Sequence, residues 1–196
     1  MAGQNGKIQG GASYLDDFES SSQKTSLTQP TYWNMSSTPS MFAESRLTND
    51  VAYGSRRALM AWYYVDPIFT RRSSTLTPSH IKSDLEQLSN HYVREVYERE
   101  LYPRKAQNSY TSASSLNVLN IAYYPDERGA YNLTTDVTPN GRLNNPSSNW
   151  GGMMRKMDNT DFEAQNIEYI EFWLMDPFFY EKRDGTTKKN LGGDLY

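Results

Sequence analysis

The chain has 196 residues, and its 20 Lys and Arg against 23 Asp and Glu give a formal charge of −3. This near balance gives no electrostatic argument for binding nucleic acid or anionic lipid. The lack of cysteine excludes disulfides, cysteine nucleophiles and thiolate metal sites. The length allows one domain with a single core, and 15 Tyr, 4 Trp and 7 Phe favour a β-rich fold over a helical enzyme.

The first 50 residues are predicted to contain one short strand. Residues 1–11 are polar and glycine-rich, without the apolar run of a signal peptide, and are expected to form a flexible segment. A strand is predicted over 12–19, between a glycine pair and a serine run. Residues 20–50 are predicted to be irregular and anchored to the core by Trp33, Met41 and Phe42.

The middle of the chain contains a predicted strand and a predicted helix. Residues 57–65 indicate a buried strand that ends at Asp66 and Pro67, although their apolar positions also fit a helical period. Ser83 and Glu86 have the spacing of a capping box. Apolar residues then repeat at helical spacing until Pro103, and a helical insertion is expected over about 77–103.

Two further strands and two turns follow. A strand is predicted over 116–124 and is expected to end at Pro125. Turns are predicted at 138–141, which contains Asn-Gly, and at 144–146. Residues 151–157 are predicted to form a strand whose glycines permit close packing.

The last predicted strand covers residues 167–174. Ile170, Phe172 and Leu174 alternate onto one face, and Pro177 limits the strand. The other face carries Ile167, Tyr169, Glu171 and Trp173, a pattern that suits the middle of a sandwich. Residues 192–196 resemble a turn and the opening of another strand, and we therefore expect a fold that is incomplete at the C-terminus.

Polar residues give little support for catalysis. The carboxylates Asp16, Asp17, Glu19, Glu168 and Glu171 include possible pairs for glycoside hydrolysis, but exposed charges are the favoured interpretation. A cation at Asp16, Asp17 and Glu19 remains an alternative, without a calcium-binding loop to support it. His80 and His91 make a poor metal site. We predict no enzyme activity and no catalytic, cofactor-binding or metal-binding residue.

Aromatic residues supply the candidate binding surface. Trp62, Tyr64, Tyr169 and Trp173, with Tyr63 beside them, could form a stacking platform for a sugar or another protein. Core packing is the favoured role for at least half of them.

Several long strings resemble, in order, the very large SprA/Sov proteins of Bacteroidetes, which are associated with gliding motility and type IX secretion. The resemblance covers most of the chain. It rests on YLDDFE at 14–19, AWYYVDPIF at 61–69, LTPSHIK at 76–82, QLSNHYVREV at 87–96, AYYPDERG at 122–129 and the block 150–178.

The resemblance implies a non-enzymatic part of an outer-membrane translocon, a large β-barrel through which folded cargo leaves the periplasm. Its partners would be other parts of the translocon, associated proteins and exported cargo. The segment would be associated with the outer membrane, on either its periplasmic or its cell-surface side. Strands that are apolar on both faces favour an accessory domain over the barrel wall. We expect a mainly β, jelly-roll-like sandwich over 12–196 with one helical insertion, and a carbohydrate-binding jelly-roll module is the alternative.

Overall fold

The structure is a computed structural model that describes residues 25–66, 71–105, 114–157, 161–163, 167, 169–177 and 193–195. The chain groups into two compact units. One is Ser26–Lys156, and the other combines Met1–Thr25 with Met157–Tyr196. All the helices and strands named below belong to the first unit.

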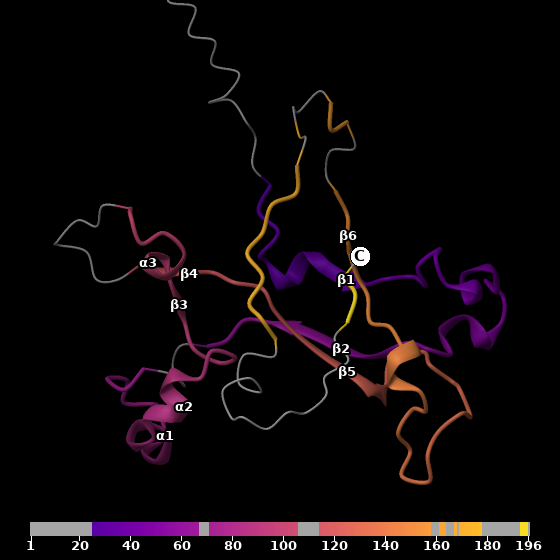
Figure 1. Cartoon of the computed structure of the whole chain (residues 1–196), viewed down its shortest axis with the longest axis horizontal. Coiled ribbons are helices and arrows are strands. Elements are labelled where there is room, and N and C mark those ends of the chain that lie inside the picture. The colour runs from indigo at the N-terminus through magenta and orange to yellow at the C-terminus, as the bar shows by residue number, and fades with distance from the viewer. Residues whose placement is uncertain are drawn as a thin grey trace, which may run out of the picture. The chain divides into compact units, whose positions relative to one another are not determined.

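The sheets of the first unit are small and antiparallel. Each pairs two strands, and the β2–β5 ribbon is the longest of the three (Figure 1). The pairs are β1 (Trp33–Met35) with β6 (Met153–Arg155), β2 (Ala58–Tyr63) with β5 (Asn120–Arg128), and β3 (Val96–Tyr97) with β4 (Ser115–Leu116).

The helices are short. Among the described residues, three are α-helical, namely α1 (Ser79–Ser83), α2 (Leu85–Ser89) and α3 (Glu98–Leu101). Single 3₁₀ turns are η1 (Pro30–Tyr32), η2 (Ala43–Arg46), η3 (Val51–Gly54) and η5 (Pro146–Ser148). The described fold is therefore broadly mixed, built mostly from small antiparallel sheets with few helices.

The β2–β5 ribbon confirms two predicted strands and changes the limits of both. The first strand is not buried as predicted, because Ala61 and Tyr63 are exposed. The helical alternative for 57–65 is wrong, because Ala58–Tyr63 pairs as β2. The prediction that Pro125 ends its strand is also wrong, since β5 continues to Arg128. Ala58 pairs with Arg128 and the next residue, Leu59, pairs with Tyr124. Pro125 therefore lies in a bulge, where its missing amide breaks no ladder hydrogen bond.

The predicted turns and the close glycine packing are confirmed. Gly141 has φ +78°, and its amide donates to the Thr138 carbonyl at 2.9 Å. Asn145 also adopts positive φ, at 52°. A Cβ at Gly152, just before β6, would lie 2.3 Å from the Ser36 hydroxyl oxygen, a distance that only glycine tolerates.

The predicted continuous helix is broken at Asn90. Asp84, one residue after the predicted Ser83, is the N-cap of α2 and accepts hydrogen bonds from the amides of Glu86 and Gln87 at 3.0 and 3.1 Å. The Asn90 side chain accepts from the Tyr92 amide at 2.9 Å, a local turn that competes with the helix. The stop before Pro103 is confirmed, since α3 ends at Leu101.

The strand predicted over 167–174 is not observed. No strand is assigned to the described residues of this stretch, 167 and 169–177. Ile170 and Phe172 are 77% and 63% exposed there. Alternation specifies which side chains share a face, but it does not supply the neighbouring strand that pairing requires. The strand predicted over 12–19 lies outside the described residues.

A buried arginine organises the core of the first unit. Arg57 is 6% exposed, and its guanidinium donates to the carbonyls of Ala130 and Ser36 at 3.1 and 3.2 Å. It also lies 5.0 Å from the ring centre of Trp150, which is 6% exposed. Burial lowers the pKa of Arg57, while the two carbonyls and the indole face compensate for part of the lost hydration.

Aromatic stacking extends this core outward. Phe42 stacks on Trp150 with ring centres 5.7 Å apart. The Arg56 guanidinium lies 5.1 Å from the centre of the Phe42 ring. Glu44 pairs with Arg56 at 2.6 Å. Phe42 is thus confirmed as an anchor, whereas Met41 is 54% exposed and is not one. Trp33 is half-buried, and its indole donates to the nearby Leu27 carbonyl at 2.9 Å.

The Arg57 backbone joins three segments of the chain. Its carbonyl accepts from the Gly129 amide at 3.1 Å and from the side chain of Asn132, which is 1% exposed, at 2.7 Å. The flanking residue Ala58 donates to the Trp150 carbonyl at 2.8 Å. A Cβ at Gly129 would lie 2.3 Å from the Ala58 carbonyl oxygen.

Gly129→Ala should therefore lower the free energy of unfolding by about 1–3 kcal/mol, because rigid backbone surrounds the added methyl group. The matched control is Gly193→Ala, where a Cβ would meet nothing within 4 Å. Urea denaturation of both variants is the measurement. Equal stability of the two variants would contradict the close approach of β2 and Gly129.

A carboxylate stabilises the start of α3. Glu100 accepts from both Nη atoms of Arg94, at 2.8 and 2.6 Å, and from the Tyr97 amide at 3.1 Å. The hydrogen bonds from Arg94, followed by that from Tyr97, lower the pKa of Glu100 to about 2.

A lowered folded-state pKa means that the Glu100 contribution to stability is complete above the ordinary value of 4.5 and is lost as the pH falls toward 2. Arg94→Gln should raise the Glu100 pKa toward 4.5. Carboxyl NMR titration of both proteins measures this shift. A Glu100 pKa that Arg94→Gln leaves unchanged would rule out the pair as its cause.

Candidate functional site

The register of the β2–β5 ribbon gives it two chemically different faces. Directly opposed residues share a face of an antiparallel pair. One face, which we call the inner face, contains Met60 opposite Tyr123 and Trp62 opposite Ile121. The other, the outer face, contains three pairs, namely Leu59 with Tyr124, Ala61 with Ala122, and Tyr63 with Asn120.

Neighbouring segments cover the inner face only in part, since Ile121 and Tyr123 are 51% and 42% exposed. The Trp62 indole donates to the Pro30 carbonyl at 3.1 Å, and the Tyr123 hydroxyl donates to the Asn149 carbonyl at 2.8 Å. A Cβ at Gly151 would lie 2.8 Å from the Tyr123 ring. Partial burial raises the pKa of the Tyr123 phenol. These contacts give the inner face a structural role.

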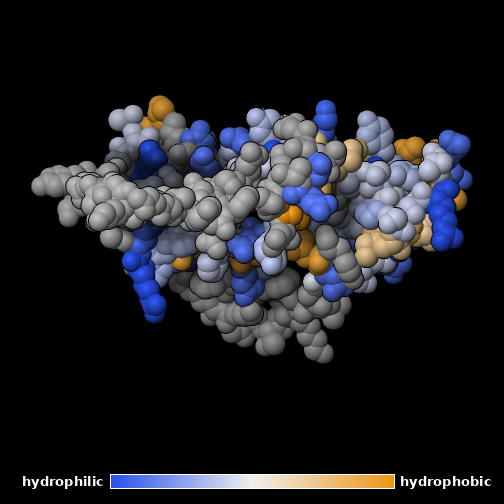
Figure 2. Space-filling view, turned by 90° about the horizontal axis from the view of Figure 1, so that it is seen from above, coloured by the Kyte–Doolittle hydropathy of each residue, from blue (hydrophilic) through white to orange (hydrophobic). Residues whose placement is uncertain are grey.

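The outer face is mostly apolar and partly exposed. Tyr63 and Tyr124 stand at opposite corners and are 40% and 45% exposed, and Ala61 between them is also exposed. The Ala61–Ala122 pair forms a low strip between the two rings, because neither side chain extends beyond Cβ. Exposed hydrophobic residues also form separate patches on the face of the molecule seen in Figure 2. A low apolar strip between two rings is suited to packing against a second sheet or chain.

The predicted aromatic platform is divided between the two units. Trp62 is half-buried, and Tyr64, which follows the last residue of β2, is 42% exposed. Tyr169 and Trp173 belong to the other unit, where they are 76% and 67% exposed. The platform thus stays a prediction. Sequence reasoning missed Tyr124, although its place beside Pro125 in an aromatic run was a signal.

One cleft among the described residues is lined by charged and polar side chains. This cleft, of about 210 Å³, lies beside η5 and contains Arg56 and Asp136 among its lining residues. Arg56 forms an ion pair with Glu44, and the Asp136 carboxylate accepts a hydrogen bond from the side-chain amide of Asn144 at 2.6 Å. Within the described part of the chain, no three metal-ligating side chains come together. Asp16, Asp17, Glu19 and Glu168 lie outside it.

The histidines lie apart from the outer face. His80 is exposed on α1, and His91 follows α2, where its charge helps to lower the Glu100 pKa. None of the described helices is long and apolar enough to cross a membrane.

If the outer face is free surface, Ala61→Lys should change the free energy of unfolding by only about 0.5 kcal/mol. Trp62→Ala, one residue away on the inner face, should lower it by about 1–3 kcal/mol, because it removes a half-buried ring and a hydrogen bond. Urea denaturation compares them. A large loss for Ala61→Lys would show that the outer face is covered in the folded chain.

Comparison with known proteins adds no homologue to this description. No protein-family model matches the chain, and no curated protein matches it. The function is therefore argued from the sequence strings and from the surface of the β2–β5 ribbon.

Proposed function

We propose that this chain is a non-enzymatic segment of a SprA-like outer-membrane protein-export channel, active in type IX secretion and gliding motility. Its role is to shape the channel and to contact other proteins. The ordered resemblance over most of the chain, from YLDDFE at 14–19 to the block 150–178, supports this proposal.

The observation that carries the proposal is the mostly apolar, partly exposed outer face of the β2–β5 ribbon. A two-stranded sheet has little stability by itself, and it gains more when its apolar face packs against another layer. Ala61 and Ala122 would let a second backbone approach, while Tyr63 and Tyr124 would flank it with apolar rings that carry polar tips. These features suit a protein partner within an assembly.

The finer fold assignment is part of the same proposal. The three antiparallel ribbons would belong to a mainly β, jelly-roll-like sandwich that other segments of the channel complete, with α1 to α3 as its helical insertion. The segment would be associated with the outer membrane on its periplasmic or cell-surface side. Its partners would be the remaining channel, associated proteins and exported cargo.

The alternative function, carbohydrate binding, receives less support from the site. Sugar platforms present ring faces to solvent, whereas the Trp62 ring is half-buried and its indole N–H is engaged by Pro30. Tryptophan fluorescence titrated with a glycan panel tests it directly. A saturable response that is lost in Trp173→Ala would favour glycan binding over the channel proposal.

The decisive experiment places Ala61→Lys in the chromosomal copy of the producing cells. We expect secretion of type IX cargo and gliding to fall at least about tenfold, because a charge would be buried against the partner layer. Leu76→Lys, at a residue that is 70% exposed on another part of the first unit, is the matched control and should have no effect.

Immunoblots of both variants must show normal protein levels for the comparison to count. Two outcomes would overturn the proposal. One is normal secretion and gliding when the whole encoding region is deleted. The other is an equal loss with Leu76→Lys and Ala61→Lys, because the outer face would then have no special role.

A further inference from the structure

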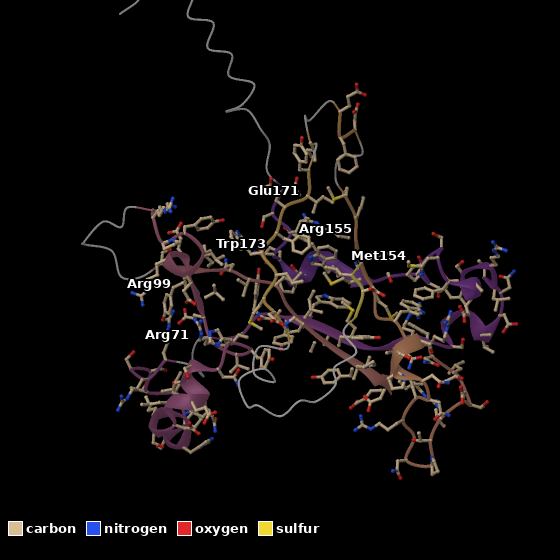
Figure 3. The ribbon with its side chains drawn as sticks, in the orientation of Figure 1. Arg71, Arg99, Met154, Arg155, Glu171 and Trp173 are labelled. Carbon is tan, nitrogen blue, oxygen red and sulfur yellow. The ribbon has the colours of Figure 1, made fainter. Side chains whose placement is uncertain are left out.

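The hairpin that follows β5 carries an asparagine-glycine pair at its tip. An antiparallel bridge between Val137 and Leu143 forms its base. The loop between β5 and η5, to which this hairpin belongs, extends beyond the end of the β2–β5 ribbon (Figure 3). Asn140 and Gly141 are both exposed at the tip. The pair is therefore open to water.

The tip has the geometry of a type I turn followed by a left-handed glycine. The Gly141 amide donates to the Thr138 carbonyl at 2.9 Å, and Pro139 occupies the second position, where its fixed φ is favoured. Asn140, at the third position, does not have the positive φ that a type II turn requires, whereas Gly141 has φ +78°. A type I turn followed by a left-handed residue is a common hairpin loop.

An asparagine that precedes glycine can react with the backbone. The Gly141 nitrogen attacks the Asn140 Cγ atom, a C–N bond forms, and the side-chain amide leaves as ammonia, which takes the Gly141 amide proton through solvent. Water then opens the resulting succinimide ring and gives aspartate or isoaspartate. Glycine favours the attack, because no Cβ shields its nitrogen.

The observed turn opposes this reaction in two ways. The Gly141 N–H is engaged by the Thr138 carbonyl, so the attacking nitrogen does not readily lose its proton. In a type I turn, moreover, the third residue has ψ of about 0°, which directs the next nitrogen away from the side chain of that residue. Ring closure requires the Gly141 nitrogen and the Asn140 side chain to lie together. The closed turn is therefore unreactive.

The Thr138 and Arg142 side chains hold the turn closed. The Thr138 hydroxyl accepts from the Arg142 amide at 3.1 Å, and the Thr138 amide donates to the Arg142 carbonyl at 2.7 Å. The Arg142 guanidinium also pairs with the carboxylates of Asp126 and Glu127, at 2.9 and 3.0 Å. Reaction thus requires local opening of the hairpin tip.

We propose that Asn140 and Gly141 form a site of spontaneous deamidation that the closed turn protects. Ring closure takes place only in the molecules whose hairpin tip has opened. The isoaspartate product has an additional backbone carbon, which does not fit the hydrogen bond from Gly141 to Thr138. Deamidation is therefore a one-way change of the hairpin. This inference does not depend on the proposed function.

Peptide mapping by mass spectrometry measures the protection in the chain incubated at mildly alkaline pH, either folded or in concentrated urea. Asn140 should convert at least about tenfold more slowly in the folded chain, because opening must precede reaction. Asn145 is the control, since it is also exposed but precedes Pro146, which has no amide proton to lose. Equal rates for Asn140 in the two conditions would overturn the proposal.

Thr138→Val tests the turn itself, because it removes the hydroxyl that accepts from Arg142. Asn140 should then convert about threefold faster in the folded chain and at an unchanged rate in urea. Thr135→Val is the matched control, since the Val137 amide donates to the Thr135 carbonyl, which this variant keeps. A folded-state rate that Thr138→Val leaves unchanged, or no conversion of Asn140 even in urea, would contradict the proposal.

Discussion

The buried guanidinium of Arg57 is the interaction on which the first unit depends. Its two carbonyl partners and the Trp150 face hold the β2 start, the segment before β6 and the loop after β5 around one group. A charge in this position is costly to bury, and the two carbonyls and the indole face offset only part of that cost, since the Nε atom has no hydrogen-bond partner. Gly129 and Asn132 further fix this region, because both donate hydrogen bonds to the backbone carbonyl of Arg57.

This polar centre also explains what sequence reasoning could and could not predict. Apolar runs and turn residues located β2, most of β5 and the turns at Gly141 and Asn145, because these features depend on local chemistry. The pairing of Arg57 with Trp150 joins residues 93 positions apart, and no local pattern encodes it. The Asn90 turn was missed for a different reason. The apolar pattern continues at helical spacing beyond Asn90, but the Asn90 side chain accepts a hydrogen bond from the Tyr92 amide in a local turn, in place of a helical hydrogen bond.

The candidate surface was predictable in composition but not in position. The sequence favoured core packing for at least half of the candidate rings, and this expectation is wrong, because Tyr64, Tyr169 and Trp173 are exposed. Which rings share a face depends on the β2–β5 register, which places Trp62 on the inner face and Tyr124 on the outer face. The register shifts at the bulge around Pro125, and bulges depend on tertiary fit rather than on residue preference alone.

Pro125 has a further effect on the ribbon. An edge strand whose backbone amides are all unpaired can pair with a strand of another molecule and start aggregation. The proline removes one donor from β5, and the surplus residues around it bend the strand away from a straight template. The end of the ribbon around Pro125 is therefore a poor template for unintended strand pairing, while the regularly paired part, from Leu59 to Tyr63, stays suited to a specific contact.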